Sequence, residues 1–346
     1  MKDFRLSLVV SAVCLVLAGY WGARNGMGVV PAIFLTLILG VMEVSLSFDN
    51  AVVNASVLKD MDEKWQQVFL TIGVLIAVFG MRLFFPIFIV SAATGFGFWN
   101  VMTMALDRPD VYAKHLHDSY TGIAAFGGMF LLLVFLSFIF DQGRELHWLG
   151  KIEEKLAALG KIDSIAIMVA LMVLFALQHY LPVDDGSRLT ILIAGVGGVV
   201  LYAAVSSLDG LFDDEQAGNS VVAAGKRNGI AGFLYLEVLD ASFSFDGVIG
   251  AFAITRDVLI IMLGLAIGAM FVRSLTVNLV RNGTLDEYVF LEHGAHYAIG
   301  ALALIMLAGI VYHVSEVVTG LIGVGFIVLA LISSNKHKRR LASQAA

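Results

Sequence analysis

The sequence predicts an all-α polytopic membrane protein, and three observations lead to this fold class. Of its 346 residues, 59% are hydrophobic and 14% are charged, and the mean hydropathy is +0.88. Soluble domains carry about a quarter charged residues, so lipid must be the solvent for most of this surface. The apolar stretches are continuous and lack the alternation of lipid-facing β-strands, which excludes a transmembrane barrel. We therefore expect residues 1–346 to form a single membrane domain.

A membrane-spanning helix needs roughly 20 apolar residues, and about ten segments of the chain meet this requirement. They are residues 6–22, 29–57, 66–93, 119–141, 164–181, 188–207, 230–255, 257–280, 294–312 and 315–333. The first follows Lys2 and Arg5 as a signal peptide would, but its small-residue cleavage pattern is weak, so we expect an uncleaved helix. The stretches 29–57 and 66–93 are long enough to predict tilt or breaks.

The loops predict the orientation of the chain and a surface helix. Fifteen of the 22 Lys and Arg residues fall on one face of the predicted topology and five on the other. By the positive-inside rule, we expect a protein of the bacterial inner membrane with both termini on the cytoplasmic side. Residues 142–163 are amphipathic around Leu149 and Ile152, as expected of a helix that lies on the membrane surface.

Two polar motifs interrupt the apolar spans and match each other. Residues 43–50 read Glu-Val-Ser-Leu-Ser-Phe-Asp-Asn, and residues 240–247 read Asp-Ala-Ser-Phe-Ser-Phe-Asp-Gly. The span after each motif carries a glycine nine residues before an arginine, namely Gly73 with Arg82 and Gly264 with Arg273. The third span of each set begins with His and Tyr and continues into small residues. Three successive spans thus share features in the same order, which chance explains poorly.

The two copies lie an odd number of spans apart, so they cross the bilayer in opposite directions. Inverted three-helix repeats with polar sites near the midplane are a transporter architecture. The expected layout is repeat 1 at 29–141, a central amphipathic segment with linking spans and a loop at 142–229, and repeat 2 at 230–313. The last span and a basic cytoplasmic tail follow at 315–346.

Five acidic residues lie within the two motif spans, and they suggest a cation site. A charged side chain at the centre of a membrane helix costs roughly 2.5–3.5 kcal/mol, so such residues are expected to be paired, protonated or hydrated. Opposed motifs would offer an all-oxygen shell for a hard cation such as Mn²⁺, Mg²⁺ or Ca²⁺. The expected ligands are Glu43, Asp49, Asn50, Glu237, Asp240 and Asp246, supported by Ser47 and Ser244, with Arg82 and Arg273 as candidate charge partners.

Helix geometry leaves two arrangements open for these acids. Glu43, Ser47 and Asn50 share one helical face, and Asp49 falls about 120° away on an unbroken helix. Either each acid faces a different neighbour, or the helix unwinds so that both meet one cavity. The Ser-x-Ser-x-Asp sequence is a poor helix former, which favours a break in both motif helices. The arginines pair with the acids or snorkel, and His293 and His296 are more simply explained as interfacial residues than as ligands.

These motifs, together with the Gly-to-Arg helix, resemble the TerC-like integral membrane proteins, which are named for tellurium resistance. The resemblance spans residues 30–333 and rests on Glu-x-x-x-Ser-x-Asp-Asn at 43–50 and Glu-x-x-Asp-x-x-Phe-Ser-x-Asp at 237–246. It implies membership of the cation and amino-acid exporter group, in which TerC-like proteins are linked to Mn²⁺ export. An inserted segment at 94–118 and additional spans indicate a longer branch.

The expected function is therefore a proton-coupled secondary transporter that exports a divalent cation, with Mn²⁺ first, and not an enzyme. Ca²⁺/H⁺ exchange, an organic substrate and a non-transporting component of a metal or tellurite stress complex are the alternatives. The expected partners are the bilayer, the cation and protons. No tightly bound cofactor is expected, and Cys14, the only cysteine, cannot form a disulfide framework. No basic stripe is interleaved with aromatic residues, so nucleic acid is not an expected partner.

Overall fold

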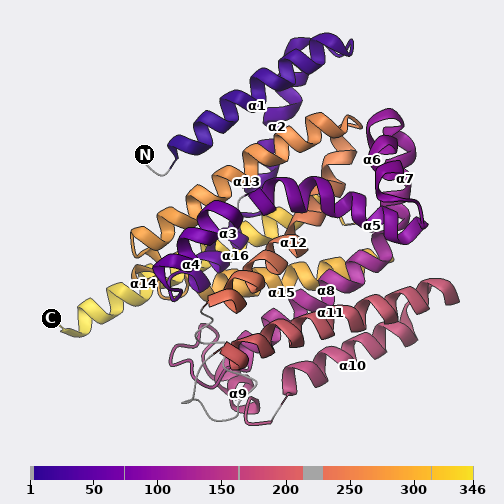
Figure 1. Ribbon diagram of the computed structural model, residues 1–346. Helices are drawn as coiled ribbons and strands as arrows, with labels where there is room; N and C mark the ends of the chain where they lie inside the picture. The colour runs from indigo at the N-terminus through magenta and orange to yellow at the C-terminus, as the bar shows by residue number, and fades with distance from the viewer. Residues whose placement is uncertain (1–3, 74, 163, 213–228, 313, 346) are drawn as a thin grey trace.

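The computed structural model describes residues 4–73, 75–162, 164–212, 229–312 and 314–345. For residues 70, 93, 208–212, 245, 246, 316, 317 and 345 it describes the backbone alone. Every regular element in this part of the chain is a helix (Figure 1). The elements are α1 (Arg5–Arg24), α2 (Val29–Leu46), α3 (Phe48–Leu58), α4 (Glu63–Val68), η1 (Phe69–Gly73), η2 (Ile76–Phe84), α5 (Phe85–Thr94), α6 (Phe98–Asp107), α7 (Pro109–Asp118), α8 (Tyr120–Ile139), α9 (Lys151–Leu159), α10 (Ile165–Tyr180), α11 (Asp185–Phe212), α12 (Gly229–Ile254), α13 (Val258–Arg281), α14 (Thr284–Glu287), α15 (Leu291–Gly309) and α16 (Glu316–Ala345).

The helices are long and apolar enough for a multi-pass membrane protein. Among the described residues, seven qualify as candidate spans by length and composition, or eight when the bent pair Glu63–Gly73 and Ile76–Ala92 is counted as one span. Of the remaining predicted spans, α10 is only 16 residues long, and α12 is 26 residues long but carries the acids of the second motif. The polytopic helical class is confirmed, and the count of ten stays a prediction.

Figure 1 shows how the helices are layered. The pair α1 and α2 forms one edge of the bundle and the pair α10 and α11 forms the opposite edge, with α8 and α15 between them. The start of α1, the end of α16 and α14 lie on the left of this view and α9 lies at the bottom, whereas α6 and α7 lie on the right. The segment predicted as an insertion at 94–118 is thus largely helical. The cytoplasmic placement of the left end stays a prediction of the charge pattern.

Glycines allow the central helices to approach one another closely. A Cβ atom on Gly264 of α13 would lie 2.4 Å from Leu39 Cβ, and one on Gly128 of α8 would lie 2.9 Å from the side chain of Leu307. On α11, a Cβ on Gly198 would lie 2.3 Å from the Phe126 carbonyl oxygen. Small residues at such crossings are how membrane helices gain packing contacts. These glycines therefore serve as packing surfaces between neighbouring helices.

The two motif helices differ in continuity. The predicted span 29–57 is two helices, because the chain leaves helical geometry at Ser47 between α2 and α3. The predicted span 66–93 also consists of several elements, with a bend of 43° between the Glu63–Gly73 and Ile76–Ala92 parts. The second motif lies instead in the uninterrupted helix α12. The expected break is therefore present in the first motif, whereas its prediction for the second motif is wrong. Packing of α12 against several neighbours outweighs the weak helix propensity of its serines.

The central segment contains a short helix, α9, and one of its charged residues, Glu153, points inward. Glu153 is fully buried, whereas Leu149 is 51% exposed and Ile152 is 65% exposed. The Glu153 carboxylate accepts hydrogen bonds from Arg144 Nη1 at 2.7 Å and from the Leu149 backbone N–H at 3.0 Å. His293 of α15 lies 3.5 Å from the same carboxylate. Polar contacts thus hold α9 against the bundle, and the side chains of Leu149 and Ile152 remain exposed, where a membrane surface would cover them.

We expect the Glu153→Gln substitution to loosen this segment by about 1–3 kcal/mol, because it leaves buried donors without a charged acceptor. Amide hydrogen exchange should accelerate across residues 141–163 and remain unchanged in α13. Glu154→Gln is the matched control, since Glu154 lies next along α9 with an exposed side chain. Equal protection in both variants would mean that the Glu153 contacts do not hold the segment.

Candidate functional site

The candidate site is built around Glu43, near the end of α2, whose side chain is 1% exposed. Ser47, one turn later, donates a hydrogen bond from Oγ to Glu43 Oε1 at 3.1 Å. Glycines on two other helices make room for this carboxylate. A Cβ on Gly247 would lie 2.6 Å from Glu43 Oε2, and one on Gly268 would lie 2.3 Å from Glu43 Cβ. Glu43 is therefore enclosed by α12 and α13 instead of facing lipid.

Arg82 supplies the positive charge at this site. Its guanidinium pairs with Glu43 through Nη2, and its Nη1 lies 3.7 Å from Asp240 Oδ2. Nη1 also donates a hydrogen bond to the Ala77 carbonyl oxygen at 2.6 Å. The arginine lies on η2, a π-helical segment, and such segments are frequent at functional sites. Of the two roles considered for Arg82, partnership with the acids is confirmed and snorkelling is wrong.

A side-chain hydrogen bond joins the two sequence motifs directly. Asn50 Nδ2 donates to Asp240 Oδ1 at 2.9 Å, and both side chains are buried. In this arrangement the Asn50 amide acts as a donor toward the carboxylate, and its Oδ1 has no hydrogen-bond partner. The motifs are separated by 190 residues in sequence, so only the tertiary fold could bring these atoms together.

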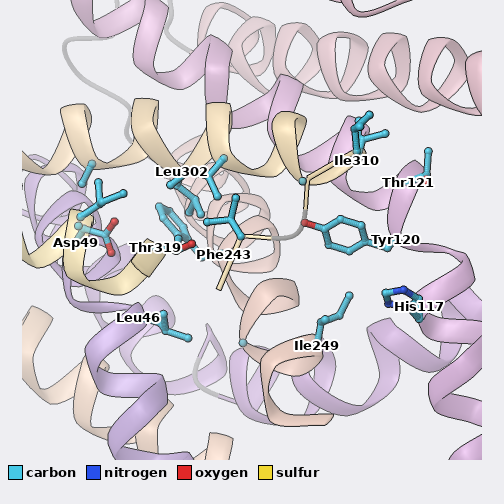
Figure 2. A pocket seen from close by; sticks show the side chains of 18 residues that line it. Leu46, Asp49, His117, Tyr120, Thr121, Phe243, Ile249, Leu302, Ile310 and Thr319 are labelled. Atoms are coloured by element: carbon cyan, nitrogen blue, oxygen red, sulfur yellow. The ribbon is translucent and has the colours of Figure 1, made fainter. Parts of the chain in front are cut away.

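Asp49 faces away from Arg82 and contributes to a separate cavity of about 290 Å³. Figure 2 shows Asp49 at one end of this cavity and Tyr120 and His117 at the other, with Phe243 between them. Asp49 accepts a hydrogen bond from the Asn50 backbone N–H at 3.0 Å and lies against Gly323 of α16. Of the two arrangements that helix geometry left open, the structure therefore has Glu43 and Asp49 facing different neighbours.

A second, smaller cavity lies beside Arg82 and shares no lining residue with the Asp49 cavity. Its volume is about 30 Å³, and its lining includes Asn54, Glu237, Asp240, Arg82 and Arg273. Gly73 is also part of this wall, and a Cβ there would lie 2.6 Å from Glu237 Oε1. Within the described part of the chain Arg273 makes no ion pair, so the matching arginines of the two motif sets have different surroundings.

The remaining predicted residues have mixed placements. Ser244 is 2% exposed, and its Oγ has no hydrogen-bond partner. The backbone of Asp246 is part of α12, but its side chain lies outside the described residues. His293 and His296, in the first two turns of α15, line a third cavity of about 380 Å³ near α9 and are buried, and their interpretation as interfacial residues stays a prediction. Burial follows from their packing against Phe138 and the segment 141–150.

Sequence reasoning missed Asn54 and the division of the polar residues between two cavities. Asn54 was detectable in principle, because it follows Asn50 by four residues and so shares the helical face of Glu43 and Ser47. It is 4% exposed, and its Oδ1 has no hydrogen-bond partner. Polarity on one face of an otherwise apolar helix is a signal even when the residue is uncharged.

The acids do not converge as a single closed metal cage. Within the described residues, no group of three or more His, Cys, Asp or Glu side chains is arranged to hold a metal ion. Instead, Arg82 stands between Glu43 and Asp240, while Asp49 and Glu237 lie in cavities on separate sides of the network. Four buried carboxylates thus accompany one ion-paired guanidinium, which leaves an excess of negative charge for protons or cations to neutralise.

Fold and site together define a multi-pass α-helical membrane protein with a buried network of carboxylates around one arginine. The chain belongs to the family described as "Protein of unknown function (DUF475)", whose model matches residues 48–341. Among the curated proteins nothing matches the chain, and among the solved structures nothing matches it either.

Proposed function

We propose that this protein is a secondary transporter that exports a divalent cation in exchange for protons, with Mn²⁺ as its substrate. The observation that carries the proposal is the meeting of Glu43 from one motif and Asp240 from the other at a single buried guanidinium. The interior holds more carboxylates than cations, and membrane acids of this kind mark ion and proton pathways. The two cavities that flank the network supply space on either side of it.

Contacts between the motifs support an inverted repeat. Glu43 has the same place in the first motif as Asp240 in the second, and Asn50 has the same place as Gly247. Glu43 lies against Gly247, and Asn50 bonds to Asp240. A two-fold relation between the halves would map the Glu43–Gly247 contact onto the Asp240–Asn50 contact, so the presence of both contacts supports such a relation.

The following helices repeat this relation. Gly73 lies against Glu237, three residues before Asp240, and the counterpart Gly264 lies against Gly40, three residues before Glu43. Helix α13 therefore packs on the first motif as η1 and η2 pack on the second. Transporters with such repeats place the substrate between the two halves, where one half rocks against the other. In this chain that interface contains Glu43, Asn50 and Asp240.

The choice of cation and of protons as the exchanged ions rests on ligand chemistry and on the sequence resemblance. Carboxylate and amide oxygens favour hard divalent ions over soft ones. Desolvation disfavours an unpaired carboxylate, so Asp49 and Glu237 would bind protons when no metal balances them. Among Mn²⁺, Mg²⁺ and Ca²⁺, the resemblance to TerC-like proteins favours Mn²⁺.

The test is ion flux into proteoliposomes that enclose a divalent-cation indicator, with Mn²⁺ and Ca²⁺ supplied separately. Wild-type protein should carry Mn²⁺, and an imposed pH gradient should change the rate. Glu43→Gln and Asp240→Asn should each lower the flux on the order of 10–100-fold. Asp110→Asn is the control, because Asp110 is exposed and its ion pair is with Arg256, which is also exposed.

The outcomes separate the candidate functions. Flux of Ca²⁺ without Mn²⁺ would replace the substrate with Ca²⁺ and retain the site. Mn²⁺ flux that is equal in wild type and in both site variants would exclude these acids from transport. Absence of flux for every divalent ion, with protein shown to be folded, would refute transport and leave a non-transporting membrane role.

A further inference from the structure

The small cavity beside Arg82 has an unusual lining of buried oxygen atoms. Among the described residues, three of them have no hydrogen-bond partner, namely Asn54 Oδ1, Glu237 Oε2 and Asp240 Oδ2. Their side chains come from α3 and α12 and are 4%, 6% and 8% exposed, respectively. All three residues line the same cavity of about 30 Å³. Each buried acceptor left without a partner costs about 1–3 kcal/mol, so something is needed to satisfy them together.

The size of the cavity limits what can occupy it. A space of about 30 Å³ holds one or two water-sized particles and excludes an amino acid or another organic substrate. The walls are formed by α3, η1, η2, α12 and α13, and the three side chains that carry the unpartnered oxygen atoms are buried. Two carboxylates and an amide oxygen are hard ligands, and a dehydrated divalent cation is the ligand class that they fit.

The neighbouring groups are compatible with a cation. Asp240 Oδ1 accepts a hydrogen bond from Asn50, and Asp240 Oδ2 lies 3.7 Å from Arg82 Nη1, which is too long for a hydrogen bond. Glu237 forms no ion pair within the described residues and is kept in place by the close approach of Gly73. Arg273 also lines the cavity, but it pairs with neither acid among those residues. The carboxylates therefore retain oxygen atoms for a ligand.

We propose that Asn54, Glu237 and Asp240 form an inner binding site for a dehydrated divalent cation, separated by the Arg82 network from the Asp49 cavity. This inference rests on the proposed transport function and locates a binding step within it. Asp240 belongs to both the site and the ion-pair network, so binding of a cation there competes with Arg82 for the same carboxylate. Binding of a cation at this site and the ion pair of Arg82 are therefore coupled through the side chain of Asp240.

The experiment is a titration of purified protein with Mn²⁺ alone, followed by the loss of the electron paramagnetic resonance signal of free Mn²⁺. Asn54→Ala and Glu237→Gln should each weaken Mn²⁺ binding on the order of 10–100-fold. Asn54→Asp keeps the side-chain size, adds a negative charge and should tighten binding. Ser56→Ala is the matched control, because Ser56 is equally buried on α3 but lines the third cavity.

The result distinguishes this site from the transport proposal. If wild-type protein binds and transports Mn²⁺, and Asn54→Ala and Glu237→Gln bind with unchanged affinity, the cavity holds only water and the inference is refuted while transport stands. Weaker or unchanged binding by Asn54→Asp would also refute the site, and this variant does not create a cavity. If wild-type protein transports no cation, the proposed function itself fails.

Discussion

Replacement of Arg82 by methionine is expected to lower the free energy of unfolding by about 3–5 kcal/mol, because it leaves buried carboxylates without their counter-charge. The side chain is 2% exposed and pairs with Glu43 and Asp240. Methionine has a similar length, so the lost interaction is mainly electrostatic and not one of volume. The measurement is reversible unfolding of the variant and of the wild type in mixed micelles at the same pH.

Arg273→Met is the matched control for this prediction. Arg273 has the same place in the second motif set, but it makes no ion pair within the described residues. We expect its substitution to change stability by less than about 1 kcal/mol. The combined variant Arg82→Met with Glu43→Gln should recover part of the lost stability, since one unpaired charge is removed with the arginine. Equal losses for the two arginine variants would contradict the assignment of Arg82 as the central counter-ion.

Gly268→Ala is expected to lower stability by about 1–3 kcal/mol and to abolish transport, because the new methyl group would overlap Glu43. A Cβ at this position would lie 2.3 Å from Glu43 Cβ and 3.0 Å from the Gly40 carbonyl oxygen. Neither atom is the far end of a flexible side chain, so helices α2 and α13 must separate. That movement would pull Glu43 away from Arg82. The measurements are unfolding in micelles and Mn²⁺ flux in proteoliposomes.

Gly325→Ala separates this clash from the general effect of adding a methyl group to a helix. Gly325 lies in α16, and a Cβ there would have nothing within 4 Å. Alanine is the better helix former by about 1 kcal/mol, so this variant should be as stable as the wild type or slightly more stable. A loss of stability for Gly325→Ala as large as that for Gly268→Ala would show that packing at Glu43 is not the cause.

Much of the architecture was available from the sequence, because bilayer thickness imposes a length on apolar segments that local composition reveals. The long stretches at 119–141 and 257–280 appear as α8 and α13 within a few residues of the predicted bounds. The matching polar motifs also identified Glu43, Asp49 and Asp240, since acids within such stretches are too costly to be incidental.

Other features depended on contacts that no local pattern encodes. Arg82 and Arg273 have equivalent positions in sequence, yet only Arg82 is ion-paired in the described structure. Glu43 and Asp49 are close in sequence but face different surroundings. Asn54 lines the same cavity as Glu237 and Asp240, and this arrangement depends on contacts between α3 and α12. Glu153, which lies within the amphipathic segment 142–163, is fully buried and pairs with Arg144.

Hydrophobic length and the cost of charge in lipid are local properties, so the amino-acid sequence was sufficient to predict a helical membrane protein with two matched sets of acids. Which acid meets Arg82, which lines the Asp49 cavity and which lines the Asn54 cavity became evident only from the arrangement of the helices. Those assignments depend on helix rotation and on close crossings at glycines. Both are set by packing between segments nearly 200 residues apart, as the Asn50–Asp240 hydrogen bond illustrates.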